Sequence, residues 1–255
     1  GKTLIYANDF KFDNTPTLGK KPNYKRLEEI GDKEVEVLIL DSTYAKEDKK
    51  MPSEIIAREM LRDVMLNTNS EGKAMIVTTF SSHIARLKSI VEFTKKIGRK
   101  PIFLGRSLHK YVTAAEKCGI ISFSKEIEMV KFGSQIKKKL KKIANTKQKY
   151  VLLVTGHQGE TKSTLSKMIN GTFDYRFSPE DIVIFSCTII PSAENIANRK
   201  IMDEKLSKQG VRLLKDIHVS GHAAREDQRE LIKLTRPKHI IPAHGDISMT
   251  SAMSE

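Results

Sequence analysis

Four of the chain's seven histidines lie in one stretch near the C-terminus, IHVSGHAAREDQRELIKLTRPKHIIPAHGD. Two of them, His222 and His244, follow strand-like apolar runs and stand beside a glycine, with a segment of helix length between them. Histidine at the mouth of a loop after a strand is a common position for metal ligands and proton donors in α/β hydrolases. Together with Asp9, which follows an early apolar run, this stretch favours a metal-dependent phosphodiesterase that acts on nucleic acid.

Acidic residues follow two apolar runs in the first part of the chain. Asp9, with Asp13 nearby, comes after residues 2–7, and Asp41 comes after residues 35–40. A carboxylate at such a position can bind a cation or orient a catalytic histidine. It can equally cap a turn through its own side chain. The residues alone leave both interpretations open.

Polar loops also occur where later strands give way to helices. Backbone amides at a helix N-terminus can hold a phosphate, and the forked guanidinium of an arginine suits the same ligand. Each loop is a weak signal alone, but three loops in one sheet favour a phosphate-binding edge. The candidate phosphate contacts in these loops are Ser81, Ser82, Arg106, Ser107, Gly156, Gln158 and Gly159.

His218, Ser220, Gly221 and His222 form a compact cluster in the C-terminal stretch. If this segment is a strand, alternation puts His218 and Ser220 on one face. Gly221 would let a phosphate approach the backbone closely. We interpret the cluster as functional, whereas His239, which precedes an apolar run, is more typical of a structural or exposed histidine.

The middle of the chain alternates between strands and helices. Apolar strands are predicted over 74–80, 100–105, 150–156 and 181–187, each followed by a helix, with a further short strand over 119–123. This alternation predicts an α/β fold with a parallel sheet covered on both faces. Such sheets place their chemistry at the carboxyl ends of the strands.

Charge indicates a polyanionic partner. The 255 residues include 45 Lys and Arg against 31 Asp and Glu, a net charge of +14. This excess favours nucleic acid, although lysine-rich compositions also serve stability in thermophiles. The lysine run from Lys137 to Lys142 fits either a solvated helix face or a nucleic-acid contact. No window approaches the roughly 18 apolar residues of a membrane helix, so we expect no membrane partner.

Seven segments in order, NDFKFD, LDSTYA, TFSSHIARL, GRSL, TGHQGE, HVSGHA and PAHGD, resemble the ribonuclease J family of the metallo-β-lactamase superfamily. The lysine-rich chain is most similar to the archaeal form. The resemblance implies an α/β fold in which a parallel-sheet β-CASP domain is inserted in a metallo-β-lactamase (αββα) fold, here only partly present. It places the β-CASP domain over 51–236 and the partial lactamase lobe over 1–50 and 237–255.

The resemblance also implies a function. Its members are ribonucleases with two zinc ions (Zn2+), so we expect hydrolysis of single-stranded RNA, 5′-to-3′, in the cytoplasm, by a protein that can form a homodimer. By motif, Asp9 would bridge the two ions and His244 would bind one of them. Asp41 would support the site, and His222 would contact the scissile phosphate as general acid. The residues that would hold a neighbouring phosphate are His218, Ser220 and Gly221, and the polar loops would line the RNA channel or a 5′-phosphate pocket.

One family motif does not occur in these residues. The His-x-His-x-Asp-His run that binds metal in the superfamily is not found, which leaves Asp9 and His244 as expected ligands, whereas zinc sites usually have at least three. We therefore expect a fragment that is inactive alone. The alternatives are a non-catalytic RNA-binding or scaffold protein of the β-CASP type, and a small-molecule metallo-hydrolase, against which the basic charge argues.

Overall fold

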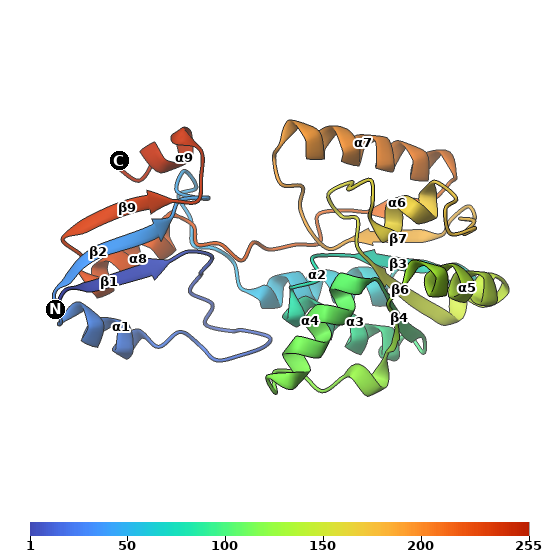
Figure 1. Cartoon of the computed structure of the whole chain (residues 1–255), viewed down its shortest axis with the longest axis horizontal. Helices are drawn as coiled ribbons and strands as arrows, with labels where there is room; N and C mark the ends of the chain where they lie inside the picture. The colour runs from blue at the N-terminus through green and yellow to red at the C-terminus, as the bar shows by residue number, and fades with distance from the viewer. Residues whose placement is uncertain (255) are drawn as a thin grey trace. The chain divides into compact units, whose positions relative to one another are not determined.

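The chain forms two compact units (Figure 1). In the computed structural model, which describes residues 1–254, unit 1 contains residues 1–56 and those from Val219 onward, and unit 2 is Ala57–His218. The domain boundaries expected from the resemblance lie at residues 50 and 237. The first is close to the observed boundary after residue 56, whereas the second lies well beyond the observed boundary after residue 218. Helix α8 (Arg225–Thr235) belongs to unit 1 because it packs against α1 (Tyr24–Gly31) and β2 (Val35–Asp41).

Unit 1 is built on a three-stranded parallel sheet in the order β1-β2-β9. Its outer strands are β1 (Thr3–Ala7) and β9 (His239–Ala243), so segments from both ends of the chain lie beside β2. Leu38 and Leu40 of β2 are fully buried in a core shared with Phe12 and Leu231. Burial of these side chains stabilises the sheet that carries the site described below.

The opposite face of this sheet is apolar but exposed to solvent. Leu4 and Tyr6 of β1 and Ile241 of β9 are 60%, 66% and 50% exposed. The register pairs Leu4 with Val37, Tyr6 with Ile39 and Ile39 with Ile241, so these side chains share one face.

Unit 2 is a six-stranded sheet in the order β5-β4-β6-β3-β7-β8, with every neighbouring pair parallel. The central strands are buried on both sides, which explains their continuous apolar sequences. This confirms the predicted α/β class. The strands are β3 (Met75–Thr78), β4 (Lys100–Leu104), β5 (Glu128–Val130), β6 (Tyr150–Val154), β7 (Ile182–Phe185) and β8 (Arg212–Leu214).

Helices cover both faces of this sheet (Figure 1). Alternate residues of each strand contact different helices, as the two-residue period of a strand requires. On one face lie α2 (Glu54–Leu66), α3 (Ile84–Lys96) and α4 (Arg106–Lys117). On the other face lie α5 (Gly133–Ile143), α6 (Thr164–Ile169) and α7 (Ala193–Lys208). The remaining helical segments are η1 (Ser124–Glu126), η2 (Ala144–Lys149) and, in unit 1, α9 (Ile247–Ser251).

One predicted strand is wrong, and the segment that carries His218 and Ser220 is not a strand. Residues 119–123 form no strand, and β4 instead pairs with Glu128–Val130. Phe123 is buried against Phe103 from an irregular segment, so its apolar character reflects core packing rather than strand pairing. Residues 217–222 are also irregular. His218 and Ser220 therefore do not share a strand face, as alternation along a strand would have required.

No helix within residues 1–254 is long and apolar enough to cross a membrane.

Candidate metal centre

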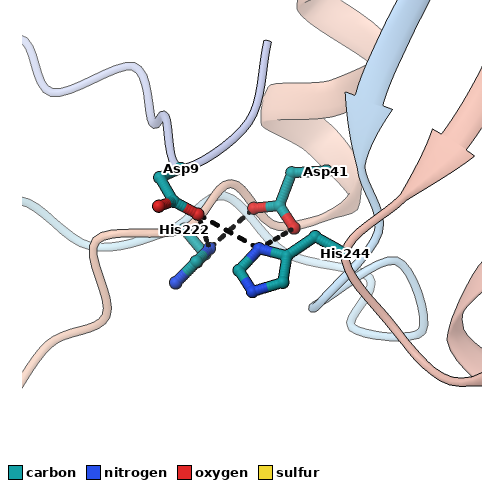
Figure 2. A group of neighbouring side chains, drawn as sticks. All are labelled: Asp9, Asp41, His222 and His244. Atoms are coloured by element: carbon teal, nitrogen blue, oxygen red, sulfur yellow. Dashed lines mark hydrogen bonds and ion pairs between the residues drawn. The ribbon is translucent and has the colours of Figure 1, made fainter.

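Four side chains meet at the carboxyl end of the sheet in unit 1 (Figure 2). Asp9 follows β1, Asp41 ends β2, His244 follows β9 and His222 precedes α8. Because the three strands are parallel neighbours, their carboxyl ends lie together. One ligand atom from each residue lies within 4.8 Å of the other three, the one such group of potential metal ligands in residues 1–254. The structure therefore joins the two expected metal ligands and the two expected catalytic residues in a single cluster.

The two carboxylates face the two imidazole rings across short distances (Figure 2). His222 Nδ1 is 2.7 Å from Asp41 Oδ2 and 3.5 Å from Asp9 Oδ1. His244 Nδ1 is 3.1 Å from Asp9 Oδ1 and 3.6 Å from Asp41 Oδ1. The ring centroids of the two histidines are 5.0 Å apart. Two carboxylates and two imidazoles at this spacing form a donor set that suits a zinc ion.

Asp41 and His222 form the tightest pair in this cluster. The Asp41 side chain is fully buried, and its hydrogen bond raises the pKa of the His222 imidazole against the opposing effect of partial burial. Burial alone would raise the pKa of Asp41, but hydrogen bonds from His222 and Thr43 outweigh it and lower that pKa. The Asp41 carboxylate is therefore charged at neutral pH and stabilises a protonated His222.

The backbone around the cluster adopts conformations that side chains rarely tolerate. Asp9 and His244 both have φ of +55°, in the left-handed region, where a non-glycine residue is strained. Beside His244, Gly245 allows a close approach, because a Cβ there would lie 2.8 Å from Ser42 Oγ. The Ser42 backbone and hydroxyl both donate to the Ala243 carbonyl, at 2.9 and 2.7 Å. These contacts extend the pairing of β2 and β9 and bring Asp41 beside His244.

Thr43 is a supporting residue to which sequence reasoning assigned no role. Its hydroxyl lies 2.6 Å from Asp41 Oδ1 and 3.0 Å from the His244 carbonyl oxygen, and its backbone N–H donates to Asp41 Oδ1 at 3.0 Å. The DSTYA segment suggested a turn, but only the fold brings residue 244 to it. Thr43 thus connects the two strand ends that carry Asp41 and His244.

We predict that Thr43→Val weakens zinc binding by about 10- to 100-fold, since outer hydrogen bonds to metal-site residues typically contribute this much. The free energy of unfolding should fall by only about 1 kcal/mol, the usual contribution of one hydrogen bond. Calorimetric titration with zinc measures the affinity. Thr15→Val is the matched control, because the Thr15 hydroxyl donates to Ser53 and not to the cluster. Unchanged zinc affinity in Thr43→Val would contradict the prediction.

The expected phosphate contacts next to His222 have different surroundings. Ser220 is buried and its hydroxyl accepts the His222 backbone N–H at 3.1 Å, while Lys11 Nζ donates to the Ser220 carbonyl at 2.9 Å. Gly221 is exposed. His218 is half-buried and belongs to unit 2, whereas the other two lie in unit 1 with the cluster. The structure therefore gives Ser220 a local role in orienting the backbone of His222.

Asp13 has the capping role that the residues alone left open. Its carboxylate accepts the backbone N–H groups of Glu54, at the start of α2, and of Thr15, both at 2.9 Å. These hydrogen bonds, with one from Ser53, lower its pKa although burial alone would raise it.

In unit 2, the polar loops lie at one edge of the sheet, as predicted from the parallel strands. Ser81 and Ser82 follow β3, and Arg106 and Ser107 begin α4 directly after β4. Ser82 and Arg106 are exposed, and the other two are half-buried. This edge therefore presents hydroxyls, a guanidinium and a helix N-terminus to solvent, a combination that can hold a phosphate.

The loop after β6 has a different character. Gln158 is buried, and its side-chain amide donates to the Thr188 carbonyl and accepts from the Ile190 N–H, at 2.9 and 2.8 Å. Gly156 and Gly159 have φ of +133° and +83°, and a Cβ at Gly159 would lie 2.5 Å from the Arg199 backbone nitrogen. Internal packing explains the conformations of these three residues, and their phosphate contacts stay a prediction.

Comparison with known proteins agrees with this architecture. Residues 72–204 match the family described as Ribonuclease J, beta-CASP domain, and residues 210–255 match the Zn-dependent metallo-hydrolase RNA specificity domain. The first range lies within unit 2, and the second includes His222 and His244.

Curated relatives cover nearly all of the chain. Ribonuclease J of Pyrococcus abyssi is 43% identical over 99% of this chain and 55% of the relative, and that of Methanocaldococcus jannaschii is 40% identical over 98% and 56%. Ribonuclease J of Thermus thermophilus is 31% identical over 96% of this chain and 41% of the relative. The chain spans about half the length of the curated relatives that it matches. The matches run through both units and through the strand ends that carry the carboxylate–histidine cluster, and they show that this chain belongs to the ribonuclease J family of β-CASP metallo-hydrolases.

Proposed function

We propose that this chain carries part of the active site of a zinc-dependent ribonuclease that hydrolyses phosphodiester bonds in single-stranded RNA. The observation that carries the proposal is the cluster of Asp9, Asp41, His222 and His244, in a chain of this family with a net charge of +14. A basic protein attracts polyanionic substrates, and a donor set of carboxylates and imidazoles suits metal-assisted hydrolysis.

Asp9 and His244 are the residues that would hold zinc. Their side chains are 65% and 47% exposed and face each other, whereas Asp41 is buried and engaged with His222 and Thr43. A second zinc ion, as the resemblance implies, would share the Asp9 carboxylate. When bound, zinc polarises water and phosphate oxygens and so promotes attack on phosphorus near neutral pH.

His222 would supply the proton for the leaving oxygen. Asp41 engages Nδ1, so Nε2 is the ring nitrogen that would give its proton to a substrate. As the oxygen of a hydroxide ion, formed when water gives a proton to the solvent, bonds to phosphorus, the bond from phosphorus to the ribose 3′ oxygen breaks. That oxygen keeps the electron pair of the bond and takes the proton from Nε2. The buried Asp41 carboxylate keeps the ring oriented and protonated before the step.

The exposed residues at the carboxyl edge of unit 2, Ser82 and Arg106 with Ser81 and Ser107, would contact the RNA backbone. On the basis of the family resemblance, we also propose that cleavage runs 5′-to-3′, that the complete site holds two zinc ions, and that the protein forms a homodimer in the cytoplasm. Light scattering on the purified chain tests the dimer.

The test of this function combines metal binding with cleavage. Mass spectrometry and calorimetry with zinc compare the chain with Asp9→Ala and His244→Ala, both of which should lose zinc. Because the chain spans about half of its relatives, cleavage of a 5′-monophosphorylated RNA is assayed both on the chain and on a chimera in which it replaces the matching part of Pyrococcus abyssi ribonuclease J.

Zinc-dependent cleavage by the chimera that disappears in His244→Ala would support the proposal. A folded chimera that binds RNA but cleaves none would favour a non-catalytic, scaffold role. Turnover of a thioester without cleavage of RNA would point to a small-molecule hydrolase.

A further inference from the structure

The strongest charge concentration in unit 2 lies on and around helix α5. Residues 131–149 contain eight lysines and no acidic residue. The buried side of α5 consists of Ile136, Leu140 and Ile143, which pack on the sheet. The lysines therefore project from the remaining surface of the helix.

Three of these eight lysines form ion pairs within the described residues. Lys137 pairs with Asp174 at 2.9 Å, Lys139 with Glu128 at 2.5 Å and Lys147 with Asp181 at 2.5 Å. Lys138, Lys141 and Lys142 are exposed and form no ion pair within residues 1–254. Two pairs of lysines, 137 with 141 and 138 with 142, are four residues apart, a spacing at which like charges destabilise a helix. A bound polyanion would relieve this repulsion.

Two further features adjoin the lysines. Phe132, directly before α5, is 50% exposed, and the Lys131 ammonium lies 5.1 Å from its ring centroid. A hollow of about 400 Å³ is lined by Lys141, Arg176 and the buried Tyr175, together with Gly171 and Asp174. The Tyr175 hydroxyl is buried without a hydrogen-bond partner in the described residues. An exposed aromatic ring beside a basic surface is the combination by which proteins bind single-stranded nucleic acid without sequence preference.

We propose that α5, Phe132 and Arg176 form a second RNA-binding surface of this protein, separate in sequence from the cluster in unit 1 and from the polar loops of unit 2. The lysines of α5 and Arg176 contact successive phosphates, and one base stacks on Phe132. This inference rests on the proposed RNA substrate but requires neither zinc nor cleavage. The binding is salt-dependent and tolerant of sequence, because phosphates and base faces are common to all RNA.

The test measures binding of fluorescein-labelled polyuridine of about 20 nucleotides, a length above the site size of one binding module, by fluorescence anisotropy in EDTA. The triple variant Lys138→Gln, Lys141→Gln, Lys142→Gln should bind roughly 10- to 100-fold more weakly near 0.1 M salt, and the slope of log K against log salt should fall by about 2. Phe132→Ala should weaken binding by roughly fivefold or more, because base stacking is lost. The arginine triple variant at the same positions and Phe132→Tyr should retain wild-type binding.

The matched control removes the same charge from the opposite face of the sheet. Lys110, Lys117 and Lys125 are exposed and without ion pairs in the described residues, and α4, which carries the first two, packs on the other side from α5. Their triple glutamine variant should bind RNA as the wild-type chain does. Circular dichroism confirms that each variant is folded.

The outcomes separate this inference from the proposed function. Loss of binding in the α5 variant alone supports it, even if the protein cleaves no RNA. An equal loss of RNA binding in the control variant would show a general charge effect and would overturn the inference. Unchanged RNA binding in both triple variants would overturn it as well. Binding of polyglutamate, but not of RNA, to the α5 surface would overturn it in favour of an acidic protein partner.

Discussion

Asp41→Asn is expected to slow RNA cleavage by roughly 10²- to 10⁴-fold, the usual contribution of general acid catalysis, while zinc remains bound. The backbone and hydroxyl of Thr43 both donate to Asp41 Oδ1, so the oxygen of an asparagine would occupy that position. Its NH2 group would then face His222 Nδ1, where Oδ2 now accepts at 2.7 Å. This arrangement favours a neutral His222 ring in which Nδ1 carries no proton. The Nε2–H group of a neutral imidazole is a far weaker acid than that of the protonated ring.

The measurement is single-turnover cleavage by the chimera described above, with zinc content determined on the same samples. Asp48→Asn is the matched control, because Asp48 is 73% exposed and, in the described residues, forms its ion pair with Arg229 on the surface of unit 1. It should leave the rate unchanged. If Asp41→Asn loses zinc as completely as Asp9→Ala, then Asp41 is a metal ligand; if it cleaves at the wild-type rate, the proposed role of the Asp41–His222 pair is wrong.

Acid is expected to destabilise the protein through His157, and His157→Leu should remove this effect. His157 is buried, both ring nitrogens lack a hydrogen-bond partner in the described residues, and its ring packs on Phe80 with centroids 4.0 Å apart. Burial lowers the pKa of His157 from 6.5 to about 4. Between these values the unfolded chain binds the proton and the folded chain does not. The free energy of unfolding therefore falls as the pH drops from 6.5 to 4, by about 3 kcal/mol from this residue.

Urea unfolding at several pH values between 7.5 and 4.5 tests this prediction. His157→Leu should equal or exceed the wild-type stability at pH 7.5, because replacing unsatisfied polar atoms by apolar ones removes a desolvation cost. On acidification, the free energy of unfolding of His157→Leu should fall less than that of the wild-type chain, by up to about 3 kcal/mol. Phe80→Leu disturbs the same packing without removing an ionisable group, so it should keep the wild-type pH dependence. An equal acid response in His157→Leu and the wild-type chain would exclude His157 as the cause.

Elements with strong local signals were predicted well. The apolar runs that became β3, β4, β6 and β7 were recognised because a strand buried on both faces must be continuously apolar. The apolar run over 119–123 was mistaken for a strand because burial alone does not distinguish strand pairing from the packing of an irregular segment. Phe123 has the burial of a strand residue without a partner strand.

In the candidate site too, local sequence predicted some features and not others. The apolar runs before Asp9, Asp41 and His244 were enough to place these residues at strand ends. Their meeting depends on the order β1-β2-β9, which joins segments about 200 residues apart. The contact of Thr43 with the residue-244 carbonyl has no local signal. Sequence reasoning likewise could not show that the Gln158 amide is satisfied by Thr188 and Ile190.

By itself, the amino-acid sequence determined the α/β class, the basic surface of α5 and the residue types capable of metal chemistry, because periodicity, charge and side-chain chemistry are properties of short segments. Tertiary structure alone decided which of those residues meet. It joined Asp41 to His222, buried His157 without a hydrogen-bond partner in the described residues and gave Gly159 a packing role. Such contacts depend on the pairing and packing of distant elements, and the free energy of each contact is set by neighbours that no local pattern specifies.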